Sequence, residues 1–376
     1  MVEPQRAPES ELDDWLRIVD RIPFVGSVKR ELTGLRRLLY DRRAPRLAVI
    51  GAAGSGRTTL ADGLLGALVF AAGAQDAGGA PRPAPGRWVR IDAGGRRLDW
   101  LELPSDADEA ALLARASEAF EEALPDVILG VVAAGAEASE GARLQSTLRV
   151  LRGRLATAET LIVLTKADAL DPLDEPARAL ASALDALRRA TSELGLADER
   201  YAAVAARPTE GRPRDDLSAL AGAILERLPD EARLEAVRAL DVGRDARRAI
   251  ARRVVNSCAA IAVTVGLAPI PFADAFILLP LQAAMVTGVA YVGGRGWDRR
   301  AALEWLASVG AVGSAGVGLR WGAQQLVKLI PGAGSLVGAS VAGAGTLAIG
   351  RSAIAYYVDG PGRLGERPEL RADNPA

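Results

Sequence analysis

The sequence has 376 residues, long enough for two domains that each bury a core, and its formal net charge of −1 gives no global indication of nucleic-acid binding. It contains no histidine, which excludes Ser-His-Asp hydrolysis, histidine-based acid–base catalysis and most zinc or iron sites. The single cysteine, Cys258, lies in an apolar run, which excludes a disulfide within the chain and favours a small buried side chain.

Residues 1–45 predict an N-terminal amphipathic helical arm. The N-terminus is acidic and has no apolar core segment, so we expect no cleavable secretion signal. Between residues 8 and 44, apolar side chains recur at helical spacing, with interruptions near Pro23 and Gly26. We expect this arm to pack either on the following domain or on a partner.

Residues 46–229 predict an α/β domain, because short apolar strands alternate with helical patterns along this stretch. Such an alternation is typical of a doubly wound, mostly parallel sheet with helices on both faces. The expected strands are residues 46–50, 88–93, 97–103, 126–133, 159–165 and 201–205, and the expected helices are residues 108–123, 143–155, 175–194 and 215–228. Residues 71–86, rich in glycine, alanine and proline, predict a mobile loop.

A glycine-rich loop, residues 51–59, follows the first strand. Against the phosphate-binding pattern G-x-x-x-x-G-K-[ST], it supplies Gly51, Gly56 and Thr58, with Arg57 in the place of the lysine. In such a loop the backbone N–H groups turn towards a phosphate, and the next helix directs its positive dipole end at the same anion. The residues predicted to bind nucleotide here are Gly51, Gly54, Ser55, Gly56, Arg57, Thr58 and Thr59, with the Thr58 hydroxyl as the Mg²⁺ ligand.

Two observations leave a structural interpretation of this loop open. Glycine-rich turns between a strand and a helix also occur without a ligand, and a planar guanidinium does not automatically do the work of an ammonium group. The chain also prefers arginine, since Lys29, Lys166 and Lys328 are its only lysines, so Arg57 has a non-functional explanation too.

A second motif, Thr165-Lys166-Ala167-Asp168 (the TKAD segment), ends a later predicted strand, and a short strand is followed by the small-residue turn Ala205-Ala206-Arg207. Taken alone, the TKAD segment is best interpreted as a solvated strand end. Together with the glycine-rich loop and the order of the strands, however, these motifs resemble those of a Ras- or Era-like GTPase domain. The resemblance implies a P-loop fold that binds GTP or GDP together with Mg²⁺.

The same resemblance assigns roles to individual side chains. It implies that the Asp168 carboxylate accepts hydrogen bonds from the guanine ring N–H and exocyclic amine, and that the stem of Lys166 lies over the base. Thr165 replaces the commoner asparagine, and Ala206 lies in the turn where the family has Ser-Ala-Lys, with Arg207 for the lysine.

Several positions depart from the GTPase pattern. No serine or threonine occurs between Leu60 and Trp100, so the threonine that ligates Mg²⁺ and senses the terminal phosphate is missing. Where the family has D-x-x-G, Glu102 stands for the aspartate and Ser105 for the glycine, whose N–H should turn onto that phosphate. With Arg57 in addition, these changes predict slow or absent GTP hydrolysis.

Residues 230–253 predict a charged linker helix, expected to be continuous from Leu234 to Arg253, and residues 254–360 predict an all-α hydrophobic helical domain. Charged residues are absent from residues 254–272 and 275–294, which approach the ~20 residues needed to span a bilayer. Prolines and many small residues interrupt these runs, so two interpretations stay open: insertion into or attachment to a membrane, and a soluble helical bundle.

Three segments of this region, residues 267–274, 328–334 and 349–357, resemble the YcjF-type hydrophobic domain of unknown function, which follows Era-like GTPase domains in bacteria. We interpret Asp274 as a helix N-cap after a proline turn rather than as part of an ion relay. Residues 361–376 predict a disordered tail.

These motifs lead to one main functional hypothesis, a membrane-associated guanine-nucleotide-binding protein with degenerate switch motifs. We expect it at the cytoplasmic face of the inner (cell) membrane, or in the cytoplasm if the hydrophobic domain is a soluble bundle. A protein partner or a homo-oligomer is compatible with the sequence, whereas nucleic acid is not expected. The alternatives are a pseudo-GTPase scaffold with a vestigial nucleotide site and, more distantly, a dynamin-like membrane remodeller, which the short stalk region disfavours.

Overall fold

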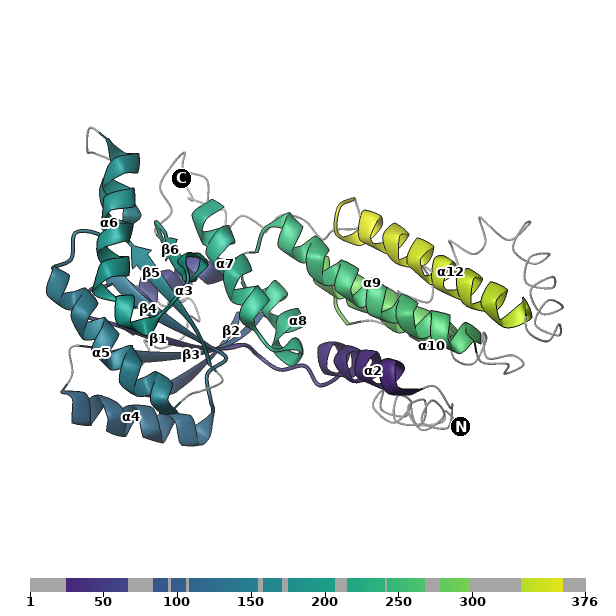
Figure 1. The fold of residues 1–376 in the computed structure, drawn as a ribbon, viewed down its shortest axis with the longest axis horizontal. Helices are drawn as coiled ribbons and strands as arrows, with labels where there is room; N and C mark the ends of the chain where they lie inside the picture. The colour runs from purple at the N-terminus through teal and green to yellow at the C-terminus, as the bar shows by residue number, and fades with distance from the viewer. Residues whose placement is uncertain are drawn as a thin grey trace, which may run out of the picture. The chain divides into compact units, whose positions relative to one another are not determined.

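The structure is a computed structural model, and it describes residues 25–66, 84–93, 96–105, 108–154, 158–170, 175–206, 215–240, 242–267, 278–297 and 333–360. The chain divides into two compact units (Figure 1): an α/β unit of residues Arg43–Ala246, and a helical unit of residues Met1–Arg42 and Arg247–Ala376. The predictions for residues 1–24, 71–83, 268–274, 328–332 and 361–376, and for Arg207, lie outside the described residues.

The α/β unit contains a six-stranded sheet with the strand order β2-β3-β1-β4-β5-β6. Its strands are β1 (Arg46–Gly51), β2 (Trp88–Ala93), β3 (Arg96–Pro104), β4 (Val127–Ala133), β5 (Glu159–Thr165) and β6 (Tyr201–Ala203). All neighbouring strands pair in parallel except β2, which is antiparallel to β3. The mostly parallel sheet confirms the predicted α/β class, since apolar strands buried on both faces require helices on each side.

Helices cover both faces of this sheet (Figure 1). The helices on one face are α4 (Glu109–Glu122), α5 (Ala138–Arg154) and α6 (Pro176–Ala190), and those on the other are α3 (Arg57–Leu65), α7 (Asp215–Arg227) and α8 (Asp230–Ala239). Short 3₁₀ turns occupy Ala167–Leu170, Ser192–Leu194 and Asp198–Arg200. On the first face, Ile50, Leu103 and Ile162 of the sheet pack with Leu112 of α4 and Leu148 of α5 in one buried core. This core joins helices α4 and α5 to one face of the sheet.

Strand β1 lies where the chain reverses its direction of winding across the sheet. From β1 the chain first builds β3 and β2 on one side and then returns to build β4, β5 and β6 on the other. In open α/β sheets, ligands bind outside the carboxyl ends of the strands at such a switch point. The fold therefore places the end of β1, and with it the glycine-rich loop, where a ligand site is expected.

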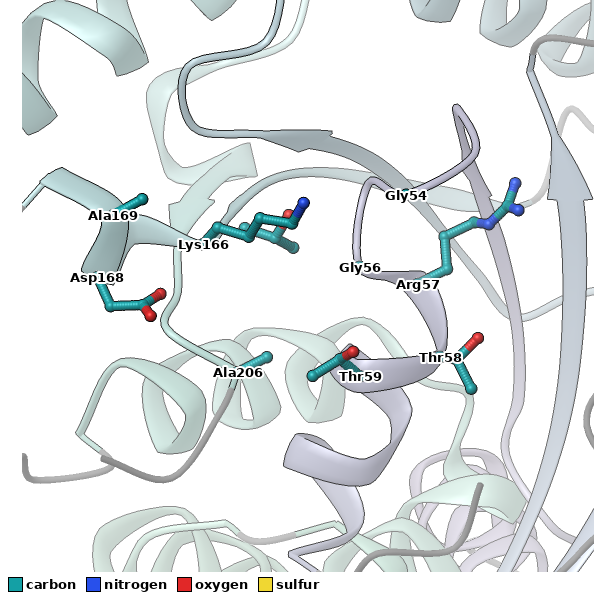
Figure 2. A pocket seen from close by; sticks show the side chains of 10 residues that line it. Gly54, Gly56, Arg57, Thr58, Thr59, Lys166, Asp168, Ala169 and Ala206 are labelled. Atoms are coloured by element: carbon teal, nitrogen blue, oxygen red, sulfur yellow. The ribbon is translucent and has the colours of Figure 1, made fainter. Parts of the chain in front are cut away.

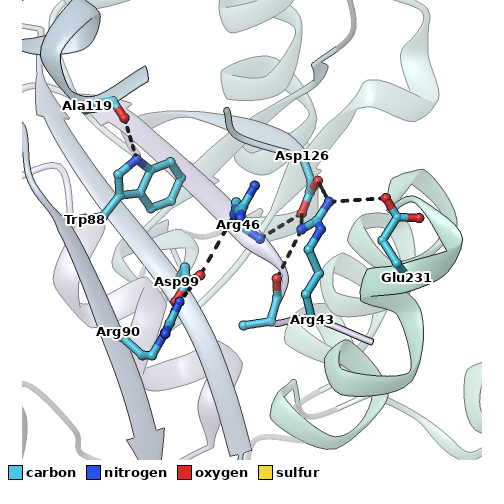
Figure 3. A network of polar contacts seen from close by, with 9 residues as sticks. Arg43, Arg46, Trp88, Arg90, Asp99, Ala119, Asp126 and Glu231 are labelled. Carbon is cyan, nitrogen blue, oxygen red and sulfur yellow. Dashed lines mark hydrogen bonds and ion pairs between the residues drawn. The ribbon is translucent and has the colours of Figure 1, made fainter. Parts of the chain in front are cut away.

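The opposite, amino-terminal end of β1 is fixed by a polar network (Figure 3). The Arg43 guanidinium donates two hydrogen bonds to the Asp126 carboxylate, of 2.8 and 2.6 Å, and lies 3.6 Å from Glu231 of α8. Asp126 also accepts the backbone N–H of Arg46 at 2.9 Å. The hydrogen bond to Asp126 raises the pKa of Arg43 above its ordinary value, against the opposing effect of burial. This two-pronged contact joins the starts of β1 and β4 to α8.

The predicted continuous helix from Leu234 to Arg253 is wrong. Helix α8 ends at Ala239, and a new helix, α9, begins at Arg244. Leu240 takes an extended conformation with φ −85° and ψ 149°, and the N–H of Val242 donates to the carbonyl oxygen of Leu240 at 2.9 Å. Both side chains are buried, so tertiary packing of two apolar residues overrides the local helical pattern.

All the regular secondary structure in the described part of the helical unit is helical. The described helices are α2 (Val25–Leu39), α9 (Arg244–Leu267, whose first three residues belong to the α/β unit), α10 (Leu279–Val292) and α12 (Ala333–Tyr357). Small residues bring them together, since a methyl group at Gly343 of α12 would collide with Val263 of α9. Within the described residues, α9 alone is long and apolar enough to cross a membrane. An apolar helical region thus accompanies the sheet unit, as the sequence predicts.

Candidate functional site

The glycine-rich loop turns sharply from the end of β1 into α3. Gly54 and Gly56 have φ angles of +79° and +89°, a left-handed conformation that residues with a Cβ rarely adopt. At Gly51, an added Cβ would lie 2.5 Å from the carbonyl oxygen of Val131, so β4 leaves no room for a side chain there. Gly56 is also the N-cap of α3 and provides no side-chain hydrogen bond to the helix. The first-turn N–H groups of α3 therefore have no side-chain cap.

A cavity of about 490 Å³, called here the loop cavity, lies between this loop and the end of β5 (Figure 2). This volume is within the range of small-molecule binding sites. The residues that line it are Gly54, Gly56, Arg57, Thr58, Thr59, Thr165, Lys166, Asp168, Ala169 and Ala206. Of the residues predicted from the sequence, only Gly51 and Ser55 do not line it. Motifs far apart in the sequence thus meet at one cavity, while their role in binding stays a prediction.

Thr165 connects the two motifs directly. Its side chain is 1% exposed, and its hydroxyl donates a hydrogen bond of 2.5 Å to the carbonyl oxygen of Ser55. Thr165 also accepts, through its backbone carbonyl oxygen, the N–H of Ala134 at 2.8 Å. Because its Oγ1 donates to the glycine-rich loop, Thr165 fixes the position of that loop relative to the TKAD segment.

Lys166 and Asp168 extend from the end of β5 at the loop cavity (Figure 2). Lys166 has a φ angle of +55°, and it is the one non-glycine residue with positive φ in the described part of the chain. A left-handed conformation costs roughly 1–2 kcal/mol for such a residue, and strain of this kind is concentrated at functional sites. Neither side chain makes a hydrogen bond or an ion pair with another described residue.

On the opposite side of the glycine-rich loop, buried Glu102 of β3 joins the first two residues of α3. Its Oε1 accepts the Thr58 hydroxyl at 3.0 Å and the Trp100 indole N–H at 3.2 Å, and its Oε2 lies 3.6 Å from Nε of Arg57. We did not place Glu102 among the binding residues from the sequence. Glu102 lies near the end of β3, the strand beside β1, at the first position of the D-x-x-G pattern. This position could have identified it as a residue of the site.

The Arg57 guanidinium is directed away from Lys166 and Asp168 (Figure 2). Besides its pairing with Glu102, it donates to the carbonyl oxygens of Gly51 and, at 3.3 Å, of Leu103. Arg57 therefore does not fill the loop cavity, and its guanidinium is held beside Gly51 of β1 and the end of β3.

The donor set at Thr58 fits a single Mg²⁺ ion. A hydroxyl has one proton and two lone pairs, and in Thr58 the proton is given to Glu102, which leaves the oxygen able to ligate a cation. The structure shows no cluster of three or more acidic, histidine or cysteine side chains in the part that it describes. A divalent ion at Thr58 would therefore need phosphate oxygens and water as its other ligands, which is the usual mode for Mg²⁺.

The turn that carries Ala206 is fixed beside the TKAD segment. The Val204 N–H donates to the carbonyl oxygen of Leu164, and the Ala167 N–H donates to that of Val204. The Asp216 carboxylate, in the first turn of α7, accepts the N–H of Ala205 at 2.7 Å. Asp216 was not among the residues predicted from the sequence, although an acidic residue in the first turn of a helix is a recognisable capping signal.

No protein-family model and no curated protein matches the sequence. Among solved structures, it is similar to a dimerization-deficient mutant of Toc33 from Arabidopsis thaliana, with 17% identity and a TM-score of 0.36 over 58% of this chain and 94% of Toc33. It is also similar to an Era point mutant from Aquifex aeolicus bound to GDP and AlF4−, with 18% identity and a TM-score of 0.32 over 57% of this chain and 66% of Era. A complex of SsGBP with GDP shares 15% identity at a TM-score of 0.33, over 60% of this chain and 63% of SsGBP. The chain thus spans slightly less than two thirds of the length of Era and of SsGBP.

Proposed function

We propose that this protein binds a guanine nucleotide, GTP or GDP, in the loop cavity and that it hydrolyses GTP slowly or not at all. One observation carries the proposal: the glycine-rich loop and the TKAD segment line the same cavity, at the switch point of the sheet. A nucleotide has an anionic phosphate end and a heterocyclic base. The glycine-rich loop offers backbone N–H groups to the phosphates, and the TKAD segment offers the side chains of Lys166 and Asp168 to the base.

The phosphate end is assigned to the glycine-rich loop and the start of α3. Backbone N–H groups after Gly56 have no side-chain cap, and the dipole of α3 favours an anion at this end. Thr58 would hold Mg²⁺, whose charge offsets that of the phosphates. Arg57 lies beside the same position, but its ion pair with Glu102 offsets its charge, so the main attraction for the phosphates comes from the backbone N–H groups and Mg²⁺.

The base end is assigned to Asp168, Lys166 and Ala206. Guanine presents two adjacent donors, its ring N–H and its exocyclic amine, which suit the Asp168 carboxylate, a group with no partner among the described residues. Adenine presents an acceptor at the corresponding ring nitrogen, and a carboxylate facing an acceptor has no hydrogen bond to make there. Asp168 therefore favours guanine over adenine, and the four-carbon stem of Lys166 offers apolar cover for the ring.

Poor hydrolysis is supported by the contacts around Gly51. The N–H of Ser105, at the position of the glycine of the D-x-x-G pattern, donates to the carbonyl oxygen of Gly51 at 3.0 Å. The same oxygen accepts from Arg57. A response to the terminal phosphate would require the Ser105 N–H to leave this bond, and the sequence offers no threonine between Leu60 and Trp100 to complete the switch.

We also propose that the hydrophobic residues 254–360 attach the protein to the cytoplasmic face of the cell membrane. Support comes from α9, whose cationic start is followed by an uncharged stretch after Arg253. A cationic segment beside an apolar helix is typical of the cytoplasmic side of a bilayer.

Titration of the purified full-length chain tests the nucleotide site. Fluorescent GDP and GTP should bind in the presence of Mg²⁺, ATP should bind at least about 100-fold more weakly, and single-turnover GTP cleavage should be slow or undetectable. Absence of binding of both guanine nucleotides would favour the pseudo-GTPase scaffold, for which the ion pair between Arg57 and Glu102 would be a purely structural contact. Rapid cleavage abolished by Thr58→Ala would contradict the proposed lack of hydrolysis.

A further inference from the structure

A second cavity, of about 620 Å³, is present within the helical unit between α9 and α12. We call it the arginine cavity, because Arg248 and Arg252 of α9 and Arg351 of α12 line it. Its other walls include the apolar side chains of Val255 and Ile354. The cavity therefore combines a cationic rim with an apolar surface.

The positive charges of the arginine cavity are only partly compensated. Arg248 donates two hydrogen bonds to Asp359, of 3.2 Å from Nε and 2.8 Å from Nη2, so this pair is close to neutral. Arg252 and Arg351 are exposed, and neither makes a hydrogen bond or an ion pair with any other residue that the structure describes. Arg248 and Arg252 are four positions apart on α9 and therefore lie on one face of the helix. Among the described residues that line it, the cavity has an excess of two guanidinium charges, which suits a phosphate group.

Beyond the cavity the exposed side of α9 is uncharged, and it carries the polar Asn256 followed by the apolar Ala260, Val263 and Leu267. Beyond Val255 the helix carries no charge as far as Leu267, and Val263 and Leu267 are 38% and 42% exposed. At about 1.5 Å per residue, the helix between Arg252 and Leu267 extends about 22 Å, somewhat more than the ~15 Å of hydrocarbon in one leaflet. A small soluble phosphate would use only the cationic end of this arrangement. An amphiphile would use both ends.

We propose that the arginine cavity binds the phosphate group of an anionic lipid, with the apolar part of α9 alongside the acyl chains. Arg252 and Arg351 hold the phosphate, and the pairing with Asp359 fixes Arg248 at the rim. This inference rests on the membrane attachment proposed above and is independent of the nucleotide site.

Vesicle binding by the full-length chain tests the inference. Vesicles are made of phosphatidylcholine alone, or of phosphatidylcholine containing phosphatidic acid, and the fraction of bound protein is measured by flotation. The wild-type chain should bind both and should prefer the anionic vesicles. Arg252→Gln combined with Arg351→Gln should reduce the affinity for anionic vesicles at least about tenfold and leave binding to neutral vesicles unchanged.

A charge-matched control distinguishes phosphate binding in the arginine cavity from the non-specific attraction of any arginine to an anionic membrane. Arg244→Gln combined with Arg253→Gln removes the same charge from α9 outside the cavity, and each arginine near an anionic surface contributes some attraction in any case. The cavity variant should therefore lose clearly more affinity than this control. Equal losses would overturn the inference. Protection of buried Cys258 from alkylation shows that the helical unit of each variant is folded.

The remaining outcomes are also distinct. Binding to neutral and anionic vesicles with equal affinity would overturn the lipid site while membrane attachment stands. No binding to either vesicle would overturn membrane attachment together with the lipid site. If inorganic phosphate binds through Arg252 and Arg351 and the variant keeps its preference for anionic vesicles, the ligand is a soluble phosphate and the lipid assignment is wrong.

Discussion

The hydroxyl of Thr165 donates a hydrogen bond to the carbonyl oxygen of Ser55, 110 positions away in the sequence, at 2.5 Å. This contact joins the end of β5 to the glycine-rich loop, so the two walls of the loop cavity are fixed by a single buried side chain. Thr165 stands where GTPase domains of the type that this sequence resembles commonly have asparagine. In this chain the hydroxyl of Thr165 connects the TKAD segment to the glycine-rich loop.

Thr165→Val should weaken this connection. The substitution preserves the shape of the side chain but leaves the Ser55 carbonyl without its partner, which should lower the free energy of unfolding of the α/β unit by about 1–3 kcal/mol. Affinity for GDP should fall as well, because the glycine-rich loop loses its support. Urea unfolding and fluorescent-GDP titration measure both effects. Thr165→Ser, which keeps the hydroxyl, is the control; equal stability of the valine and serine variants would show that the bond contributes nothing.

Lys166 offers a way to separate backbone strain from ligand binding. Lys166→Ala and Lys166→Gly both remove the ammonium group and should weaken GDP binding to a similar extent. Only glycine adopts the left-handed conformation without penalty, although it loses more entropy on folding. The glycine variant should therefore be as stable as the alanine variant or up to about 1 kcal/mol more stable in urea unfolding. A glycine variant that is less stable would show that the φ angle of +55° stores no strain.

Asp168→Asn should change the preference for the base. An amide at this position presents a donor where the carboxylate presented an acceptor, so guanine loses its match and xanthine, which has a carbonyl in place of the exocyclic amine, gains one. Affinity for GDP should fall about 100-fold or more, and affinity for XDP should rise relative to GDP. Asp92→Asn, on the exposed part of β2, is the matched control and should leave both affinities unchanged. Unchanged GDP binding by the Asp168 variant would place the base elsewhere.

Thr58 should determine the effect of Mg²⁺ on nucleotide binding. Removal of Mg²⁺ by a chelator should weaken GDP binding to the wild-type chain at least about tenfold, because the phosphates lose a counter-ion. Thr58→Ala should bind GDP weakly with or without Mg²⁺, whereas Thr58→Ser should retain the dependence. The comparison is made by titration at fixed ionic strength. If the alanine variant responds to Mg²⁺ as the wild type does, the ion is held by other ligands.

Cys258 is a probe of the helical unit. Its side chain is 0% exposed in α9, so an alkylating reagent should modify it at least about 100-fold more slowly in the native chain than in the denatured chain. Mass spectrometry of the intact protein follows the reaction. Rapid labelling without denaturant would mean that α9 is not packed as the structure shows.

Much of this structure was predictable because it is encoded locally. Uninterrupted apolar runs identified the central strands β4 and β5 to within a residue, and glycine spacing identified the loop after β1. The order of the motifs along the chain was sufficient to expect them at one edge of a parallel sheet. The helix after the fourth strand was placed less well: α5 begins at Ala138 rather than at residue 143.

Other features depend on neighbours that a single sequence does not reveal. The contact of Glu102 with Thr58 and Arg57 is set by the register of β3 against β1, and the left-handed conformation of Lys166 is imposed on a residue that does not favour it. The break between α8 and α9 follows from the burial of Leu240 and Val242, which only the folded unit determines. In each case tertiary packing overrides the local preference.

The attachment of Arg43 to Asp126 and Glu231 also limits how this sheet can respond to a ligand. Because the beginnings of β1 and β4 are locked together there, sliding of one strand past the other would have to break a bidentate ion pair. A ligand in the loop cavity would therefore have to act by rearranging the segments at the far ends of the strands, because the body of the sheet is held in place at its other end.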